Sequence, residues 1–107
     1  MEVKLFDSFA QAKEILKPNE PRLVAAADQS VCVVLLDGRL VAFRNECPHM
    51  GAPLHQGNIN YLHEIVCPLH TYRFSLATGE EVQHRCGALQ FVQVIDKGEI
   101  FLKISRS

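Results

Sequence analysis

Apolar and polar positions alternate with a period of two at residues 2–6 and 39–44, which is typical of half-buried β-strands. Short apolar, β-prone runs predict further strands at residues 22–27, 31–36, 64–66, 89–95 and 99–104, with 80–82 pairing back after a turn at Thr78-Gly79. Asp37-Gly38 separates two of these runs and predicts a tight hairpin, since both central positions of such a turn need a positive φ.

One segment near the N-terminus has a helical period instead. Ser8 begins it as a helix cap, with Gln11 as a capping-box partner, and a Pro beyond Leu16 ends it. Its apolar positions fall on one face: Phe9, Ala12, Ile15 and Leu16. One short helix followed by many short strands predicts an all-β antiparallel barrel or sandwich. At 107 residues the chain is expected to form a single domain, 1–107.

Two short motifs carry the candidate chemistry. Cys47-Pro48-His49 is followed, after seventeen residues, by Cys67-Pro68-Leu69-His70. Thiolates select iron–sulfur clusters, zinc or Cu(I), and imidazole suits iron, zinc and copper. Structural zinc sites usually pair like ligands at short spacing, whereas each motif here pairs a cysteine with a histidine. Mixed pairs suit a two-iron centre in which two histidines replace two cysteines on one iron.

The four ligand positions, in this order and spacing, resemble the Rieske [2Fe–2S] motif. The flanking runs 50–52, 72–74 and 76–80 extend the resemblance, which covers most of the chain. It implies one [2Fe–2S] cluster per chain, with Cys47 and Cys67 on one iron and His49 and His70 on the other. It also implies a Rieske-type antiparallel scaffold that carries a two-loop cluster-binding subdomain at about residues 45–75.

The resemblance also bears on the reduction potential. High-potential members carry a disulfide between the loops, at positions held here by Ala52 and Leu69. They also place a serine and a tyrosine where this chain has Tyr72 and Phe74. Fewer donors to the cluster stabilise the reduced form less, so we expect a ferredoxin type toward the low end of the family's range of about −150 to +300 mV.

Three functions are compatible with the motif. The first is a soluble one-electron carrier that passes electrons from a flavin reductase to a terminal oxygenase and catalyses nothing alone. The chain also resembles the small subunit of an NAD(P)H nitrite reductase, whose partner would be the large subunit. The third is a zinc-stabilised interaction module without a redox role, which would be colourless.

Composition narrows the setting. The net charge of −1 gives no sign of a nucleic-acid partner, and no apolar run approaches the length of a membrane span. The N-terminus lacks the features of a signal peptide, so we expect a cytoplasmic protein whose cysteines stay reduced. Cys32 is expected in the core, and Cys86 either shields the cluster or is passive.

Several further residues near the motifs could belong to the site or only support the fold. Apolar residues near the motifs form either a docking rim or loop packing: Met50, Pro53, Leu54 and Leu69. His55 is expected to be a surface loop residue. Four acidic residues are expected to be solvated, with a docking patch for a basic reductase as the alternative: Glu46, Glu64, Glu80 and Glu81. Arg73 is expected to form a salt bridge within the fold, with a place near the cluster, where its charge would raise the reduction potential, as the alternative.

Overall fold

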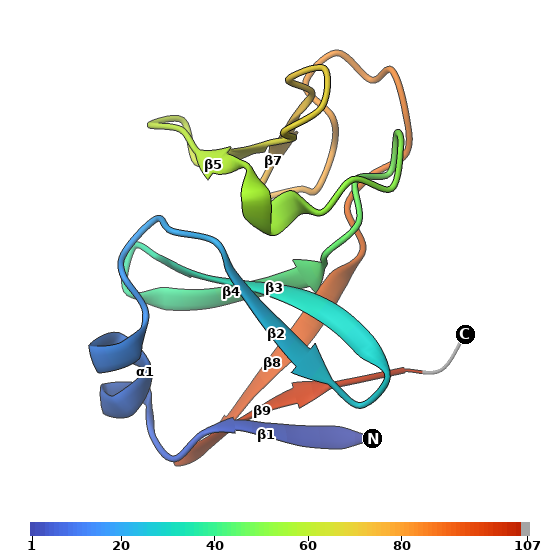
Figure 1. The fold of residues 1–107 in the computed structure, drawn as a ribbon. Coiled ribbons are helices and arrows are strands. Elements are labelled where there is room, and N and C mark those ends of the chain that lie inside the picture. The colour runs from blue at the N-terminus through green and yellow to red at the C-terminus, as the bar shows by residue number, and fades with distance from the viewer. Residues whose placement is uncertain (106–107) are drawn as a thin grey trace.

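A computed structural model of the chain describes residues 1–105 as two antiparallel sheets and one short helix (Figure 1). The six-stranded sheet has the order β1-β9-β8-β4-β3-β2, and the three-stranded sheet has the order β5-β6-β7. The elements are β1 (Glu2–Phe6), α1 (Phe9–Ile15), β2 (Arg22–Ala26), β3 (Gln29–Leu36), β4 (Arg39–Arg44), a 3₁₀ turn (Leu54–Gln56), β5 (Asn58–Ile59), β6 (Glu64–Val66), β7 (Arg73–Ser75), β8 (Phe91–Lys97) and β9 (Glu99–Lys103).

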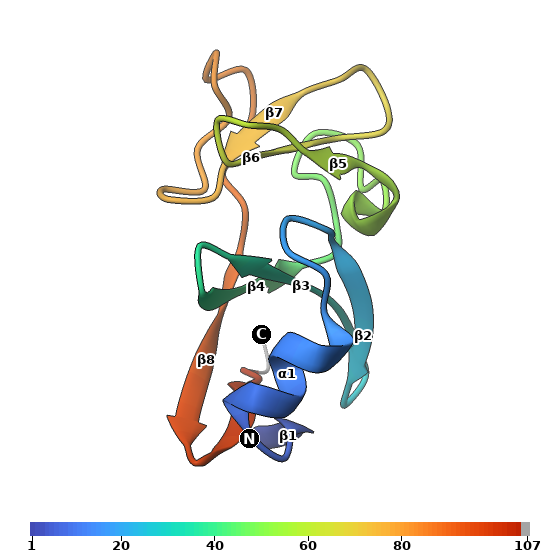
Figure 2. The same ribbon diagram turned by 90° about the vertical axis from the view of Figure 1, so that its left-hand side faces the viewer.

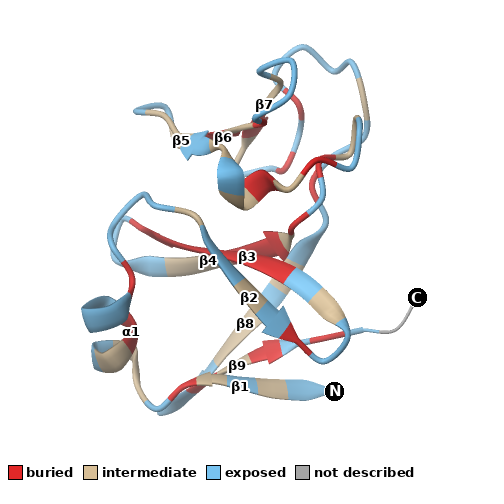
Figure 3. Cartoon of the chain, in the orientation of Figure 1, coloured by how far each residue is buried: buried red, intermediate tan, exposed pale blue. Residues whose placement is uncertain are grey.

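Strand β3 separates two hydrophobic cores, which explains its unbroken apolar run. Successive side chains of a strand point to opposite faces. One face of β3 packs inside the curled large sheet with residues of β1 and β9, through Val31, Val33 and Leu35. The other face packs beneath the small sheet, through Cys32, Val34 and Leu36. Figure 3 shows β3 buried between the two parts of the molecule.

The small sheet and the loops around it form a separate layer at one end of the large sheet, the upper part of Figures 1 and 2. Within this layer Gly57 lies very close to the backbone of β6, and an added Cβ would collide with the carbonyl oxygen of Val66. Only glycine fits so near a neighbouring backbone.

The predicted helix and strands are present with shifted ends, except that only Glu81 of the segment 80–82 pairs, in an isolated bridge with Phe74. Ser8 caps α1 by accepting a hydrogen bond from the Gln11 amide at 3.0 Å. Asp37 and Gly38 both have positive φ, as the predicted hairpin requires. Strand β8 runs from Phe91 to Lys97, later than expected. The all-β antiparallel class is confirmed, while a single domain spanning 1–107 stays a prediction.

Candidate metal centre

The two motif loops close in the same way. The amide N–H of Cys47 donates to the carbonyl of Ala52 at 2.9 Å, and that of Cys67 donates to the carbonyl of Tyr72 at 2.7 Å. Each cysteine is thus tied to the residue five positions later. The matched closures give two loops of equal length whose cysteines start from rigid strand ends, after β4 and after β6.

Left-handed backbone turns both loops. Gly51 has φ +72° in the first loop, and its amide donates to the carbonyl of Cys47 at 2.7 Å. In the second loop two side-chain-bearing residues, His70 and Thr71, have φ values of +63° and +54°. Non-glycine residues rarely adopt this conformation, and such strain gathers at functional sites. The surrounding structure therefore holds His70 in a costly orientation.

The two motif cysteines are buried together. Cys47 and Cys67 lie in one core cluster of buried residues. Burial, with the neighbouring Cys47 thiol, raises the pKa of Cys67 to about 11. Both groups would have to lose their protons to bind iron, so metal loading releases protons.

The rings of the two motif histidines lie next to each other in an edge-to-face arrangement. Their ring centroids are 5.8 Å apart and their planes meet at 74°. The Nδ1 atom of His49 is buried and has no hydrogen-bond partner within residues 1–105. A buried nitrogen without a partner is costly in a folded protein unless a ligand satisfies it. His70 is exposed, so one side of the pair opens to solvent.

The donor set fits a two-iron cluster. In the part of the chain up to residue 105, no three His, Cys, Asp or Glu side chains gather around a single point. A [2Fe–2S] cluster of the mixed type needs two ligands at each iron, one thiol pair and one imidazole pair. A zinc ion needs four ligands about one point.

The four apolar residues near the motifs, which were expected to form either a docking rim or loop packing, differ in their exposure to solvent. Met50 and Leu69 are exposed beside the two histidines, as a rim requires. Leu54 is fully buried in the core cluster that contains residues of β3 and β4, so of the two alternatives it has the loop-packing role. Pro53 is half-buried. An apolar side chain at a loop can face either way, and only packing decides which.

His55 is more tightly held than a surface loop residue. Its amide donates to the Asn45 side-chain oxygen at 2.7 Å, and its ring Nδ1 lies 2.8 Å from the Asn45 amide nitrogen. Asn45 is itself buried, directly after β4 and before the first loop. The pair fastens the 3₁₀ turn to the strand that delivers Cys47.

We predict that Asn45→Ala lowers the free energy of unfolding by about 2 kcal/mol, because it removes the hydrogen bond to the His55 amide and the contact with the His55 ring. Urea denaturation of the cluster-loaded protein would measure the loss. Asn58→Ala, at an exposed position of β5, serves as the control and should change stability by less than about 0.5 kcal/mol. Equal effects of the two substitutions would show that the Asn45–His55 pair contributes nothing.

The four acidic residues do not share one environment. Glu46 and Glu80 are exposed, and Glu64 is half-buried with its carboxylate 3.4 Å from Arg73. The Arg73 salt bridge is thus present. Glu81 is buried, which corrects the expectation that it is solvated. Its role was missed because burial of a charge at one position leaves no mark on the local sequence pattern.

Cys32 and Cys86 occupy different surroundings. Cys32 is fully buried in β3, and burial raises the pKa of its thiol to about 12. This confirms the expected core role. Cys86 is half-buried and packs against the core cluster that contains Cys47 and Cys67. Its burial and the neighbouring Cys47 thiol raise its pKa.

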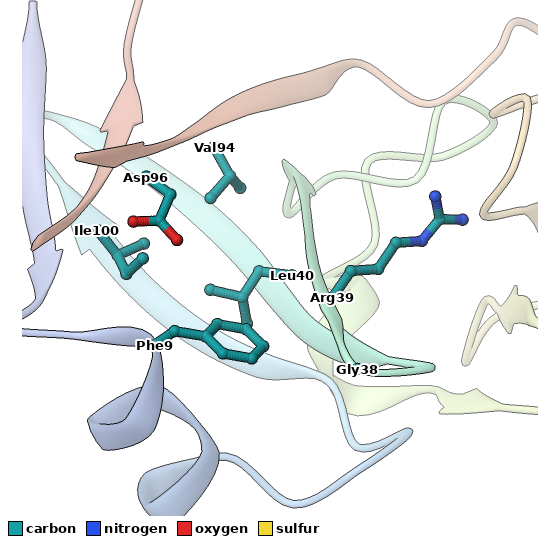
Figure 4. Close-up of a pocket in the computed structure, with 7 residues that line it drawn as sticks. All are labelled: Phe9, Gly38, Arg39, Leu40, Val94, Asp96 and Ile100. Carbon is teal, nitrogen blue, oxygen red and sulfur yellow. The ribbon is translucent and has the colours of Figure 1, made fainter. Parts of the chain in front are cut away.

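A cavity of about 350 Å³ lies far from the motif loops, between α1 and strands β4, β8 and β9 (Figure 4). Its one carboxylate, on Asp96, already accepts a hydrogen bond from the Gly98 amide at 2.9 Å. Figure 4 shows the Arg39 side chain extending away from Asp96. Apolar side chains make up most of the remaining lining. The candidate metal ligands all lie at the motif loops.

Comparisons with known proteins agree with this geometry. A curated human protein described as a Rieske domain-containing protein is 37% identical over 68 residues, which cover 61% of this chain and 43% of that protein. This chain therefore corresponds to less than half of the relative's length. The Nocardioides aromaticivorans IC177 ferredoxin of carbazole 1,9a-dioxygenase is 30% identical, with a TM-score of 0.77 over 95% of this chain and 96% of that one.

A second solved structure is similar in fold but is described as part of another enzyme. The putative NADH-dependent nitrite reductase small subunit from Mycobacterium tuberculosis has a TM-score of 0.77 over 99% of this chain and 97% of that one. At 17% identity it supports the fold alone. The family model described as the Rieske [2Fe-2S] domain matches residues 8–93, which include both motif loops and most of the strands. The chain belongs to the Rieske [2Fe–2S] domain family.

Proposed function

We propose that this protein is a one-electron carrier in which Cys47 and Cys67 hold one iron of the family's [2Fe–2S] cluster and His49 and His70 hold the other. Family membership supports the cofactor. When bound, the cluster takes up and releases a single electron. The observation that carries the ligand assignment is that two loops which close alike bring their two cysteines into one buried cluster and their two histidine rings to within 5.8 Å.

Each side chain has a distinct part in this proposal. The buried thiols keep their iron away from solvent, which limits loss of the cluster. The exposed His70 ring, with Met50 and Leu69 beside it, gives a partner close access to the histidine side. An electron would enter and leave at that edge, where the protein layer is thinnest.

The test is an absorption spectrum of freshly purified protein, with electron paramagnetic resonance (EPR) after dithionite reduction. We expect a brown protein whose reduced form gives a rhombic signal with an average g below the free-electron value. A colourless protein with stoichiometric zinc, and no signal after anaerobic reconstitution, would support the zinc-stabilised module instead.

The proposed partners are a flavin reductase as donor and a terminal oxygenase as acceptor. The similarity to a ferredoxin of a dioxygenase, over nearly the whole of both chains, supports this choice. The second candidate is the small subunit of an NAD(P)H nitrite reductase, which the fold-level similarity to such a subunit favours. Co-purification with a nitrite reductase large subunit would decide for the second, and reduction by a flavin reductase followed by oxygenase turnover for the first.

We propose a cytoplasmic location, because thiols that must stay reduced for cluster binding suit a reducing compartment. No helix among residues 1–105 is long and apolar enough to cross a membrane.

We predict a reduction potential in the lower part of the family's range, near about −150 mV and not near +300 mV. Phe74, at the position of the high-potential tyrosine, is fully buried and has no hydroxyl to donate. Ala52 and Leu69 cannot form the disulfide of that class. A spectroscopic redox titration measures the potential, and a midpoint well above zero would contradict the ferredoxin type.

A further inference from the structure

Three flat side chains stack in a row that ends at His49. The His49 and Tyr72 rings lie 4.0 Å apart at centroids and are tilted by only 15°. On Tyr72, the central guanidinium carbon of Arg85 lies 3.7 Å from the ring centroid. The row joins the first loop, the end of the second loop and the segment after β7, which are far apart in sequence.

A buried carboxylate holds the outer end of this row. Glu81 accepts hydrogen bonds from Arg85 Nε at 3.0 Å and from Arg85 Nη2 at 2.8 Å. It also accepts from the amides of Arg85 and Gln83 at 2.8 and 3.2 Å. These contacts, chiefly those to the Arg85 side chain, lower the pKa of Glu81 to about 2. A two-pronged ion pair on a buried acid gives the guanidinium one orientation.

Glu81 is itself placed by the small sheet. It pairs with Phe74 of β7 in an isolated bridge, and the Val82 amide donates to the carbonyl of Arg73 at 2.9 Å. Both contacts of Arg85 are therefore fixed by β7: Tyr72 directly precedes this strand, and Glu81 is bridged to it. The stack is a part of the rigid layer and not a contact between loose surface chains.

His49 lacks the usual device for holding a ligand histidine. Such a ring is commonly oriented by a hydrogen bond from one nitrogen to a carboxylate or carbonyl while the other binds metal. No hydrogen bond involves the His49 ring among residues 1–105, and its Nδ1 is buried without a partner. The face of the ring, in contrast, is covered by Tyr72.

We propose that Glu81 and Arg85 are positioning residues that hold the His49 ring in its ligand orientation by clamping Tyr72 against it. The proposal rests on the ligand role of His49 in the proposed function. It assigns orientation to face-to-face packing where a hydrogen bond normally serves. The planar guanidinium matters for this role, because a lysine ammonium has the charge but neither the flat face nor the fork.

The test compares Arg85→Lys and Arg85→Gln with the wild type after cluster reconstitution. Arg73→Gln is the matched control, because Arg73 is similarly exposed (40% against 38%) and also pairs with a glutamate of this layer, without stacking on Tyr72. The readouts are the rate of cluster loss to a chelator, the reduction potential, and the two ligand-nitrogen couplings resolved by pulsed EPR.

We expect both Arg85 variants to lose the cluster about tenfold faster than the wild type, the scale typical of outer partners of ligand histidines. One of the two nitrogen couplings should broaden, the other should stay sharp, and the potential should shift in both variants. Arg73→Gln should match the wild type in all three readouts.

Two results would overturn the proposal. Wild-type behaviour of Arg85→Lys, with only Arg85→Gln altered, would mean that the charge alone acts. Wild-type behaviour of both variants would mean that the stack has no role. If Arg85→Gln fails to fold because Glu81 is left unpaired, the double variant Glu81→Gln/Arg85→Gln removes the buried charge and must show the same broadened coupling. Absence of a rhombic signal in the wild type would instead overturn the proposed function, and the clamp with it.

Discussion

Replacing Cys67 with serine is expected to abolish cluster assembly. The Cys67 thiol lies buried against Cys47 at the centre of the two loops. A serine hydroxyl is harder than thiolate sulfur and far less acidic, so it is a poor substitute in a site built for iron and sulfide. The brown absorption and the rhombic EPR signal should both disappear, and the iron content of the reconstituted protein should fall to background.

Cys86→Ser is the matched control for this experiment. Cys86 packs against the same core cluster but is not one of the four proposed ligands. The variant should retain the absorption and the EPR line shape of the wild type. Loss of the cluster in Cys86→Ser, with retention in Cys67→Ser, would exchange the ligand roles of the two cysteines and contradict the proposed ligand set.

Replacing Phe74 with alanine is expected to lower the free energy of unfolding by about 3–5 kcal/mol. Phe74 is fully buried in the middle of β7, where it is paired with Ile65 of β6 and bridged to Glu81. Removing a ring from such a site loses its transfer free energy and leaves a cavity that rigid strands cannot fill. Urea denaturation of the cluster-loaded protein, followed by circular dichroism, measures the change.

Phe91→Ala is the control for size and chemistry. Phe91 lies on β8 and is 44% exposed, so its loss should cost less than about 1 kcal/mol. A similar loss in both variants would mean that Phe74 contributes no more than a surface ring. A large loss in Phe74→Ala together with faster cluster release would show that the small sheet supports the metal centre directly.

The strand pattern and the four-residue motif could be read from the amino-acid sequence because both depend on local order. Alternation marks β1 and β4, and a two-residue Asp37-Gly38 turn allows one hairpin geometry. The ligand types and their spacing are local as well. They limit the choice of metal without any knowledge of the fold, and the match to the Rieske family model agrees with a [2Fe–2S] cluster.

Local order failed where a long-range contact decides the role of a residue. The local pattern around Leu54 left a docking rim and loop packing both open, and it gave no sign of the role of Gly57. In the structure Leu54 fills the core beneath the loops, and Gly57 is needed for a close approach to Val66. Both roles depend on the position of a strand that follows later in the chain.

The sequence by itself determined the fold class, the helix cap, the hairpins and the four proposed ligands, since periodicity, turn chemistry and ligand softness act between near neighbours. Only the tertiary structure decided that Glu81 is buried, that Arg85 covers Tyr72, and that Tyr72 covers His49. These residues meet because β7 and the segment after it fold back over the first loop. No pattern within a single segment encodes which face of a side chain another segment will cover.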